Sequence, residues 1–308
     1  MGTSYSVSVA GPETRNRSRL AMAIRQAIEQ VDSLMSTYRE DSDISRLNRH
    51  PAGHPLQVSE ETLEVLEAAQ RVGELTGGAF NVTVGALVDA WGFGPAPPAG
   101  PPDPQAVLEL QRATGWDKLE LDRRQRVLRK LDAGLQVDLS GIAKGFAVDQ
   151  VAETLEDGGH RSYLVDIGGE VRVGAERAPG RPWRIGVERP EATGRLVHRI
   201  LSVSDTAMAT SGNYRNFRES QGRRYGHVLD PRTGNPSETD VASATVLDSS
   251  AMRADAVATA LLVLGSQRAI ALAEREGLPV LLLVADESAG WMEIESSAFR
   301  ARISAGAR

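Results

Sequence analysis

Residues 3–9 alternate small polar and apolar side chains, which is the pattern of a half-buried strand. Apolar side chains then recur at helical spacing from Leu20 to Met35 and predict an amphipathic helix. A second helix should begin after Ser59, because this N-cap residue is followed by two glutamates, and should end at the Gly77-Gly78 pair. The chain is therefore expected to open with a strand and two helices.

A third helix should begin at Asp103-Pro104, and the Pro-rich segment 94–104 before it is expected to be an exposed loop. From about residue 117 the pattern becomes β-rich, interrupted by apolar helices at 250–264 and 266–276. The expected strands are KLELD, RVLRKL, SYLVDI, WRIGVE, VHRILSV, VASATVL, LPVLLLVA and WMEIE, and the last of these should close the chain. Hairpin-like strands with segregated helices indicate an α+β fold.

The composition limits the possible functions. Of the 308 residues, 41% are hydrophobic and 25% are charged, and no apolar run is long enough to cross a bilayer. The net charge of -6 argues against nucleic acid as a partner, because nucleic-acid-binding surfaces are usually basic. Cysteine is absent, which excludes disulfides, thiolate metal sites and cysteine nucleophiles. The first residues lack the basic and apolar segments of an export signal, so either the protein is cytoplasmic or a leader is missing.

The segment VDLSGIAKGFAVD (137–149) is the first candidate for a binding site. A strand is expected to end at Asp138 and to lead through Ser140-Gly141 into a helix that carries Lys144. Small residues let backbone amides approach a ligand, a helix start attracts negative charge, and a lysine adds a cation, which suits a phosphate or a ribose. The segment matches neither the P-loop nor the dinucleotide fingerprint, and an ordinary strand-to-helix turn with a solvated lysine fits the pattern equally well.

Asp255 and Thr259 form the second candidate. They lie four residues apart in SSAMRADAVATALLVLG and so share one face of a helix. A carboxylate in a helix of small and apolar residues needs a partner, because an unpaired buried charge is costly. Carboxylate and hydroxyl oxygens are ligands that suit Mg²⁺. The alternative is a structural aspartate near the helix start, with the threonine bonded to its own backbone.

Two further segments carry candidate chemistry. His227 lies in the turn-rich, arginine-rich segment 210–236, where an imidazole with its ordinary pKa of about 6.5 can act as a base or can brace the DPRTGNP turn. In the segment 77–94, Phe80, Trp91 and Phe93 offer flat surfaces that can stack an aromatic ring or can simply form core.

Together these segments, in this order, resemble the ApbE family of FAD:protein FMN transferases over nearly the whole chain. The stretches that carry the resemblance are MGT (1–3), MSTYREDSDISRLN (35–48), GGAFNVTVGALVDAWGFG (77–94), VDLSGIAKGFAVD (137–149), LVDIGGEV (164–171), TSGNYRNF (210–217), GHVLDPRTGNP (226–236) and ADAVATALLVLG (254–265). The resemblance implies a single domain over residues 1–308, built as two closely packed lobes of mixed and antiparallel sheet with helices, T-fold-like, with the active site between the lobes.

The resemblance also implies a set of site residues. Asp255 and Thr259 would bind Mg²⁺ with a backbone oxygen of Gly141, and Asn81 stands where the family usually has aspartate, so that a charged contact becomes a neutral one. His227 is the expected general base, with Asp255 as the alternative. The positions expected to contact FAD are Met1, Tyr38, Ala79, Phe80, Asn81, Asp138, Lys144 and Leu229.

The implied reaction is the transfer of FMN from FAD, through its phosphate, to a Ser or Thr hydroxyl of an acceptor protein, with release of AMP. The acceptor would carry a Ser/Thr-Gly-Ala/Ser-Thr/Ser-like segment and would belong to an electron-transfer flavoprotein. An FAD pyrophosphatase that forms FMN and AMP, and a non-catalytic flavin-binding protein, are the alternatives. The family also suggests a periplasmic or cell-envelope location if a leader has been removed.

Overall fold

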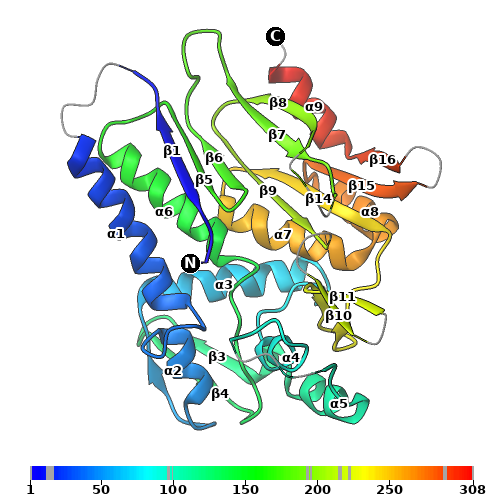
Figure 1. Cartoon of the computed structure of the whole chain (residues 1–308). Coiled ribbons are helices and arrows are strands. Elements are labelled where there is room, and N and C mark those ends of the chain that lie inside the picture. The colour runs from blue at the N-terminus through cyan, green and yellow to red at the C-terminus, as the bar shows by residue number, and fades with distance from the viewer. Residues whose placement is uncertain are drawn as a thin grey trace. The chain divides into compact units, whose positions relative to one another are not determined.

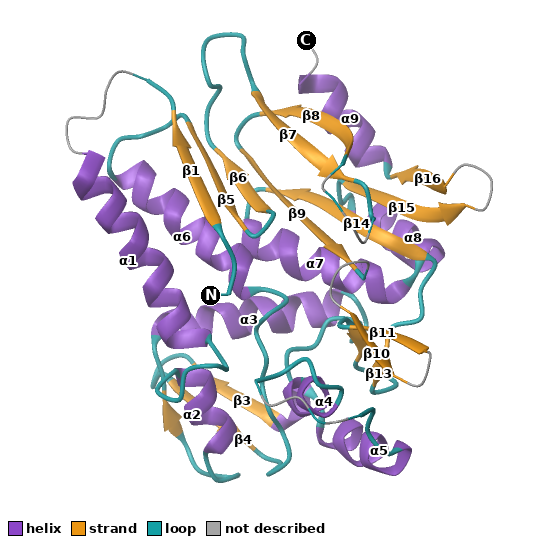
Figure 2. Ribbon diagram, in the orientation of Figure 1, coloured by secondary structure: helices purple, strands orange, loops and turns teal. Residues whose placement is uncertain are grey.

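The computed structural model describes residues 2–11, 17–95, 98, 100–191, 194, 196–213, 217–220, 223–286 and 290–306. The chain divides into two compact units. The first contains Met1–Gln30, Lys144–Arg215 and Thr239–Arg308, and the second contains Val31–Ala143 and Asn216–Glu238. Both units contain helices, and the named strand pairs of the described residues are antiparallel, which confirms the expected α+β class (Figure 2).

In the described part of the first unit, seven strands form one sheet (Figure 1). Their order is β1 (Tyr5–Val9), β5 (Tyr163–Ile167), β6 (Glu170–Val173), β9 (Thr206–Gly212), β14 (Val241–Asp248), β15 (Val280–Asp286) and β16 (Gly290–Glu295). Alternation along the strands gives this sheet two different faces. In β6, for example, Val171 and Val173 point to one face, so Glu170 and Arg172 point to the other.

One face of the sheet is packed into an apolar core. The two-stranded ribbon of β7 (Trp183–Glu188) and β8 (Val197–Val203) and the helix α9 (Ser297–Gly306) supply the other half of that core. Its central side chains are Val171, Val173, Ile185, Val187, Leu201, Met208, Leu247, Leu281, Leu283 and Phe299. Burial of this surface is the main stabilising term for the unit.

The opposite face is covered by helices. α7 (Ala251–Leu264) packs on β9 and β14, and α8 (Ser266–Glu276) packs on β15. α7 is buried nearly all round, as its run of alanine, valine and leucine requires. It begins at the N-cap Ser250, whose hydroxyl accepts from the amide of Arg253, and it ends at Gly265. α6 (Ala143–Asp157) lies beside α7, and α1 (Arg17–Met35) begins in this unit.

The second unit contains short helices and small sheets. Its helices are α2 (Asp43–Arg49), α3 (Glu60–Leu75), α4 (Gly85–Ala90), α5 (Pro104–Ala113) and the 3-10 turn Trp116–Lys118. Its strands are β2 (Leu56–Gln57), β3 (Leu119–Asp122), β4 (Val127–Lys130), β10 (Phe217–Ser220), β11 (Arg223–Gly226), β12 (Leu229–Asp230) and β13 (Asn235–Pro236). Ser59 and Asp103 cap α3 and α5 with their side chains, as expected from the sequence.

Two expectations about elements were wrong. The segment before Asp138 is extended but forms only an isolated bridge between Gln136 and Val84, because no neighbouring strand continues the ladder. WMEIE does not close the chain, since β16 is followed by α9. The described residues of 94–104 form no helix or strand until Pro104, which agrees with the expected loop, while Ala96, Pro97 and Ala99 lie outside the described residues.

Candidate active-site residues

The helices α6 and α7 touch at their first turns, and this contact positions the charged groups of the first unit. A Cβ added at Gly145 would lie 2.2 Å from the carbonyl oxygen of Ala251, so only glycine allows this approach. The Gly145 amide donates to Oδ2 of Asp255 (3.1 Å). The start of α6 thus supplies a hydrogen bond to a carboxylate of α7, as helix N-termini commonly do.

Asp149 of α6 holds the start of α7 in place. Its carboxylate accepts from the amides of Ala251 and Met252 (both 3.0 Å) and from the hydroxyl of Ser250 (2.8 Å). Arg172 of β6 completes this arrangement with an ion pair to Asp149 (2.9 Å). A carboxylate at a helix N-terminus is favoured by the helix dipole, so this contact fixes the position from which α7 runs.

Lys144 lies between two buried carboxylates. Its Nζ is 2.8 Å from Oε1 of Glu170 and 3.5 Å from Oδ2 of Asp255. The side chains of Glu170 and Asp255 are 5% and 3% exposed, whereas that of Lys144 is 33% exposed. Burial alone would lower the pKa of Lys144, but Asp255 and Glu170 outweigh it and raise that pKa. Burial and the charge of Asp255 raise the pKa of Glu170 to about 7, although Lys144 opposes the shift.

Thr259 lies one turn after Asp255 on α7. Its hydroxyl bonds to the hydroxyl of Ser211 in β9 (3.0 Å), so the simple interpretation in which it bonds only to its own backbone is incomplete. Among the described residues, no group of three His, Cys, Asp or Glu side chains could hold a metal ion. A carboxylate and a hydroxyl four residues apart nevertheless fit Mg²⁺, which keeps several waters and uses few protein ligands. The negative charge of two buried carboxylates beside one ammonium also favours a cation here.

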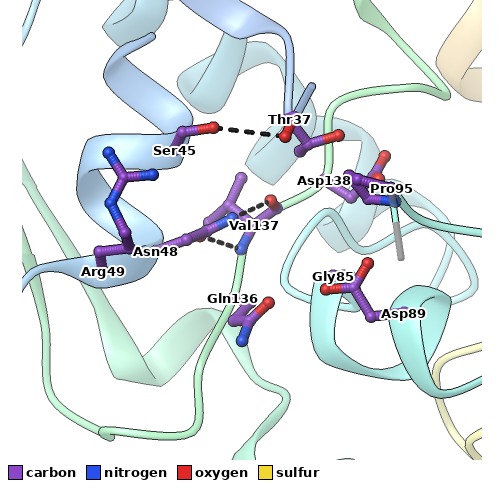
Figure 3. Close-up of a pocket in the computed structure, with 10 residues that line it drawn as sticks. All are labelled: Thr37, Ser45, Asn48, Arg49, Gly85, Asp89, Pro95, Gln136, Val137 and Asp138. Atoms are coloured by element: carbon purple, nitrogen blue, oxygen red, sulfur yellow. Dashed lines mark hydrogen bonds between the residues drawn. The ribbon is translucent and has the colours of Figure 1, made fainter. Parts of the chain in front are cut away.

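The second unit contains a polar cavity of about 170 Å³ (Figure 3). Its lining residues are Thr37, Ser45, Asn48, Arg49, Gly85, Asp89, Pro95, Gln136, Val137 and Asp138. Asn48 of α2 fixes one wall, because its side-chain amide donates to the carbonyl of Val137 (2.9 Å) and its oxygen accepts from the amide of Val137 (2.7 Å). The Asn48 side chain therefore holds the backbone of this cavity wall in place.

Asp138 and Asp89 are the two carboxylates of this cavity, and Arg49 is the cation of its lining. Asp138 accepts from the amide of Ser140 (2.7 Å) and from its hydroxyl, and the Asp138 amide donates to the carbonyl of Val82 (2.8 Å). Burial and the nearby charge of Asp138 raise the pKa of Asp89. Gly141 follows in the turn that leads to α6.

The segment Ala79-Phe80-Asn81 follows α3, where Gly77 and Gly78 take positive φ (59° and 82°) and end the helix. Ala79 and Phe80 are buried, and the Phe80 amide donates to the hydroxyl of Thr76 (3.2 Å). The Asn81 oxygen accepts from the amide and the hydroxyl of Thr83 (2.9 and 2.8 Å). The neutral side-chain amide of Asn81 therefore supplies the hydrogen-bond acceptor of this turn.

Leu229 and Trp91 belong to an apolar cluster of the second unit. Leu229 is 7% exposed and packs with Leu87, Trp91 and Val107, so any contact of this position with a ligand involves its backbone. The Trp91 indole donates to the carbonyl of Gly234 (2.8 Å), which supports the core interpretation of this aromatic residue.

Three remaining candidates differ in their surroundings. The centroids of the His227 and Phe93 rings are 6.3 Å apart, and the two rings meet edge-on. Tyr38 lies in the turn after α1 and is 71% exposed, as a residue awaiting a ligand or a partner would be. Met1 lies outside the described residues.

Four residues that lie beside the candidate site residues in the structure had no role assigned from the sequence: Asn48, Asp89, Glu170 and Ser211. The local signal for Glu170 was an acidic residue directly after two glycines. For Asn48 and Ser211 no local signal exists, because their partners Val137 and Thr259 are distant in the sequence.

Comparison with known proteins identifies the family of the chain. The family model described as "ApbE family" matches residues 1–282. FAD:protein FMN transferases of Vibrio cholerae and Haemophilus influenzae are 44% and 40% identical to this chain; each alignment covers 97% of this chain and 90% or 88% of the relative.

Solved structures agree with this result. The flavin transferase ApbE from Vibrio cholerae superposes with a TM-score of 0.89 at 41% identity, covering 98% of this chain and 96% of that one. The apo flavinyl transferase ApbE of Pseudomonas stutzeri gives a TM-score of 0.87 at 34% identity, covering 98% and 94%. Among the described residues, no helix has the length and apolar character needed to span a membrane. The chain belongs to the ApbE family.

Proposed function

We propose that this chain transfers FMN from FAD to a Ser or Thr hydroxyl of an acceptor protein and releases AMP. Relatives that match almost the full chain at 40–44% identity are named FAD:protein FMN transferases. The observation that carries the proposal within this chain is the buried Asp255 carboxylate, which lies 3.5 Å from the ammonium of the partly exposed Lys144 side chain. This arrangement supplies a cation for a phosphate and a carboxylate for a metal ion.

The reaction needs charge stabilisation at the diphosphate of FAD. A bond forms between the acceptor oxygen and the FMN-side phosphorus, the bond from that phosphorus to the bridging oxygen breaks, and AMP leaves with the electron pair. Bound Mg²⁺ would supply Lewis-acid stabilisation of the phosphoryl oxygens. Asp255, Thr259 and a backbone oxygen of Gly141 would hold it, and these oxygen donors fit its preference. Lys144, which the neighbouring carboxylates keep charged, would bind a phosphoryl oxygen.

The acceptor hydroxyl must lose a proton as it attacks. We assign this step to His227, because imidazole is the side chain that most often acts as a general base. Asp255 is the second choice, since a carboxylate can also accept a proton.

The remaining predicted residues would bind FAD itself: Met1, Tyr38, Ala79, Phe80, Asn81, Asp138 and Leu229. The exposed ring of Tyr38 is suited to stacking on a flat ligand. Asp138 lies in the wall of the polar cavity, where a carboxylate can accept from an N–H or O–H of the ligand. The acceptor would present a Ser/Thr-Gly-Ala/Ser-Thr/Ser-like segment of an electron-transfer flavoprotein subunit.

The test is the incubation of the chain with FAD, MgCl₂ and a synthetic peptide that carries such a segment. We expect the peptide to gain the mass of FMN less one water, with one AMP released for each peptide modified. Formation of free FMN and AMP with an unmodified peptide would instead indicate an FAD pyrophosphatase. Intact FAD at the end of the incubation would indicate a flavin-binding protein.

A further inference from the structure

Glu170 is fixed at the start of β6 by a tight turn. Gly168 and Gly169 connect β5 to β6 with φ of 68° and 102°, and Ile167 pairs directly with Glu170 across the hairpin. The Gly169 amide donates to the Asp166 side chain (3.0 Å) and the Gly168 amide to the carbonyl of Ser4 (3.1 Å). The carboxylate of Glu170 therefore extends from a backbone with little freedom to move.

The ammonium of Lys144 is bonded to Glu170 and only lies near Asp255. The two distances are 2.8 Å and 3.5 Å, and the shorter is an ordinary charge-assisted hydrogen bond. Oε2 of Glu170 is buried and has no hydrogen-bond partner among the described residues. A buried carboxylate with one unpaired oxygen is costly, so a role beyond stability is expected for it.

A divalent cation on Asp255 and the Lys144 ammonium would repel each other at such close range. Without a second anchor, the ammonium would either move out of the site or occupy Asp255 in place of the metal ion. Glu170 prevents this competition, because its carboxylate binds the Lys144 ammonium and leaves Asp255 available to the cation. When both carboxylates are ionised, the charges of the three side chains sum to a net negative value, which a divalent cation can offset.

We propose that Glu170 is a positioning residue for FMN transfer that holds the Lys144 ammonium beside Asp255, so that the ammonium and a divalent cation occupy the site together. This inference rests on the proposed function, since it assumes that Asp255 binds a metal ion. Glu170 then acts on the cation through Lys144 and is not itself a ligand.

Calorimetric titration of MgCl₂ into the FAD-free protein tests this inference with a double-mutant cycle. We expect Glu170→Gln to weaken Mg²⁺ binding by about 10-fold or more, as loss of a partner behind a metal ligand commonly does. Lys144→Gln should tighten binding, because a competing positive charge is removed. In the Lys144→Gln background, Glu170→Gln should change the affinity by no more than about 3-fold.

Two results would overturn the inference. Equal losses from Glu170→Gln in both backgrounds would mean that Glu170 acts directly on the cation, through Oε2. An unchanged affinity in the single Glu170→Gln variant would mean that Lys144 needs no second anchor. If Glu170→Gln fails to fold, Glu170→Asp, which keeps the charge but shortens the side chain by one methylene, replaces it in the same cycle.

Two controls accompany the cycle. Glu153 also lies on α6, is exposed and is bonded to Gln150, so Glu153→Gln removes one negative charge without touching Lys144 and should leave Mg²⁺ affinity unchanged. Asp255→Asn identifies a failure of the proposed function itself. If the Mg²⁺ affinity of this variant equals that of the unmodified protein, the metal is not bound at Asp255. Both the metal assignment and this inference are then wrong.

Discussion

Two pairs of carboxylates, one pair in each unit, have different surroundings. In the first unit, Asp255 and Glu170 are almost fully buried and share the Lys144 ammonium. In the second unit, Asp89 and Asp138 face a cavity, and their mutual repulsion adds to the effect of burial on the pKa of Asp89. The first arrangement contains an ammonium bonded to one of the two carboxylates, whereas in the second Asp138 accepts from Ser140 and the cavity lining also includes Arg49.

This difference shows what each arrangement can recognise. A buried pair of carboxylates that already contains an ammonium can exchange or share that cation, which suits metal ions and phosphates. A partly open cavity with acceptor oxygens and a fixed backbone wall suits uncharged N–H and O–H groups, such as those of a flavin, an adenine or a ribose. We therefore propose that the first unit binds the phosphoryl groups of FAD and that the second recognises its rings.

Replacement of Asp255 is the substitution from which we expect the largest effect on activity. Asp255→Ala should lower single-turnover FMN transfer by about 10³-fold or more, because a charge that stabilises the transition state is lost. Asp255→Asn keeps an oxygen for the Gly145 amide and serves as the matched control for shape. Transfer by the asparagine variant at the rate of the unmodified protein would show that the carboxylate charge is not needed.

Replacement of His227 tests whether the second unit also contributes proton transfer. His227→Ala should slow transfer to the peptide by on the order of 10²-fold while FAD and Mg²⁺ affinities stay within about 3-fold. Phe93→Leu removes the ring that His227 contacts and is the control for a bracing role. If both variants lose FAD affinity, thermal stability and transfer together, His227 braces the turn and the base role passes to Asp255.

A methyl group at Gly145 tests the geometry of the first unit without any change of charge. Gly145→Ala should reduce the free energy of unfolding by about 1–3 kcal/mol, because the new Cβ would meet the backbone of α7. Urea denaturation measures this change. Gly186→Ala in β7 is the control, since a Cβ there would make only ordinary contacts of 3.4–3.5 Å with Val197. Equal stabilities of the two variants would contradict the described contact of α6 and α7.

The smallest expected effect concerns Asp89. Because its pKa is raised in the folded protein, its charge opposes folding above that pKa, and this effect is absent below the unfolded pKa, where the group is protonated in both states. Asp89→Asn should therefore stabilise the protein by a few tenths of a kcal/mol near pH 8, after allowance for solvent screening, and by less near pH 3.5. Urea denaturation at both pH values measures this, with Glu64→Gln on the exposed face of α3 as control. A gain independent of pH would exclude the charge as its cause.

Local signals explain which parts of the fold were predictable. The caps Ser59 and Asp103 and the glycines after α3 mark helix ends through hydrogen bonds within a few residues, so the sequence alone could locate them. α9 was missed because SAFRARISAG has only two large apolar residues, Phe299 and Ile303, and owes its position to their packing against the sheet core. The extended segment before Asp138 resembles a strand locally, but a strand also needs a partner.

The candidate site was predictable to a similar extent. The spacing of Asp255 and Thr259 determines that they share a helix face, and that inference needs no tertiary structure. The partner of Asp255 could not be deduced, because Lys144 and Gly145 reach it from a different helix. Glu170 was overlooked for the same reason, since its importance depends on a contact that only the packing of β6 against α6 creates.

The order of the sheet has a consequence for how the chain folds during synthesis. Of the strands in this sheet β1 is synthesised first, yet its neighbour is β5, so Tyr5 cannot pair until Ile167 has been made. Pairing over such a long separation is slow, and an unpaired strand is open to association with other chains in the interval. We therefore expect the yield of folded protein to depend on translation speed and on chaperones that shield β1 during synthesis. This dependence should be present even if the finished sheet is stable.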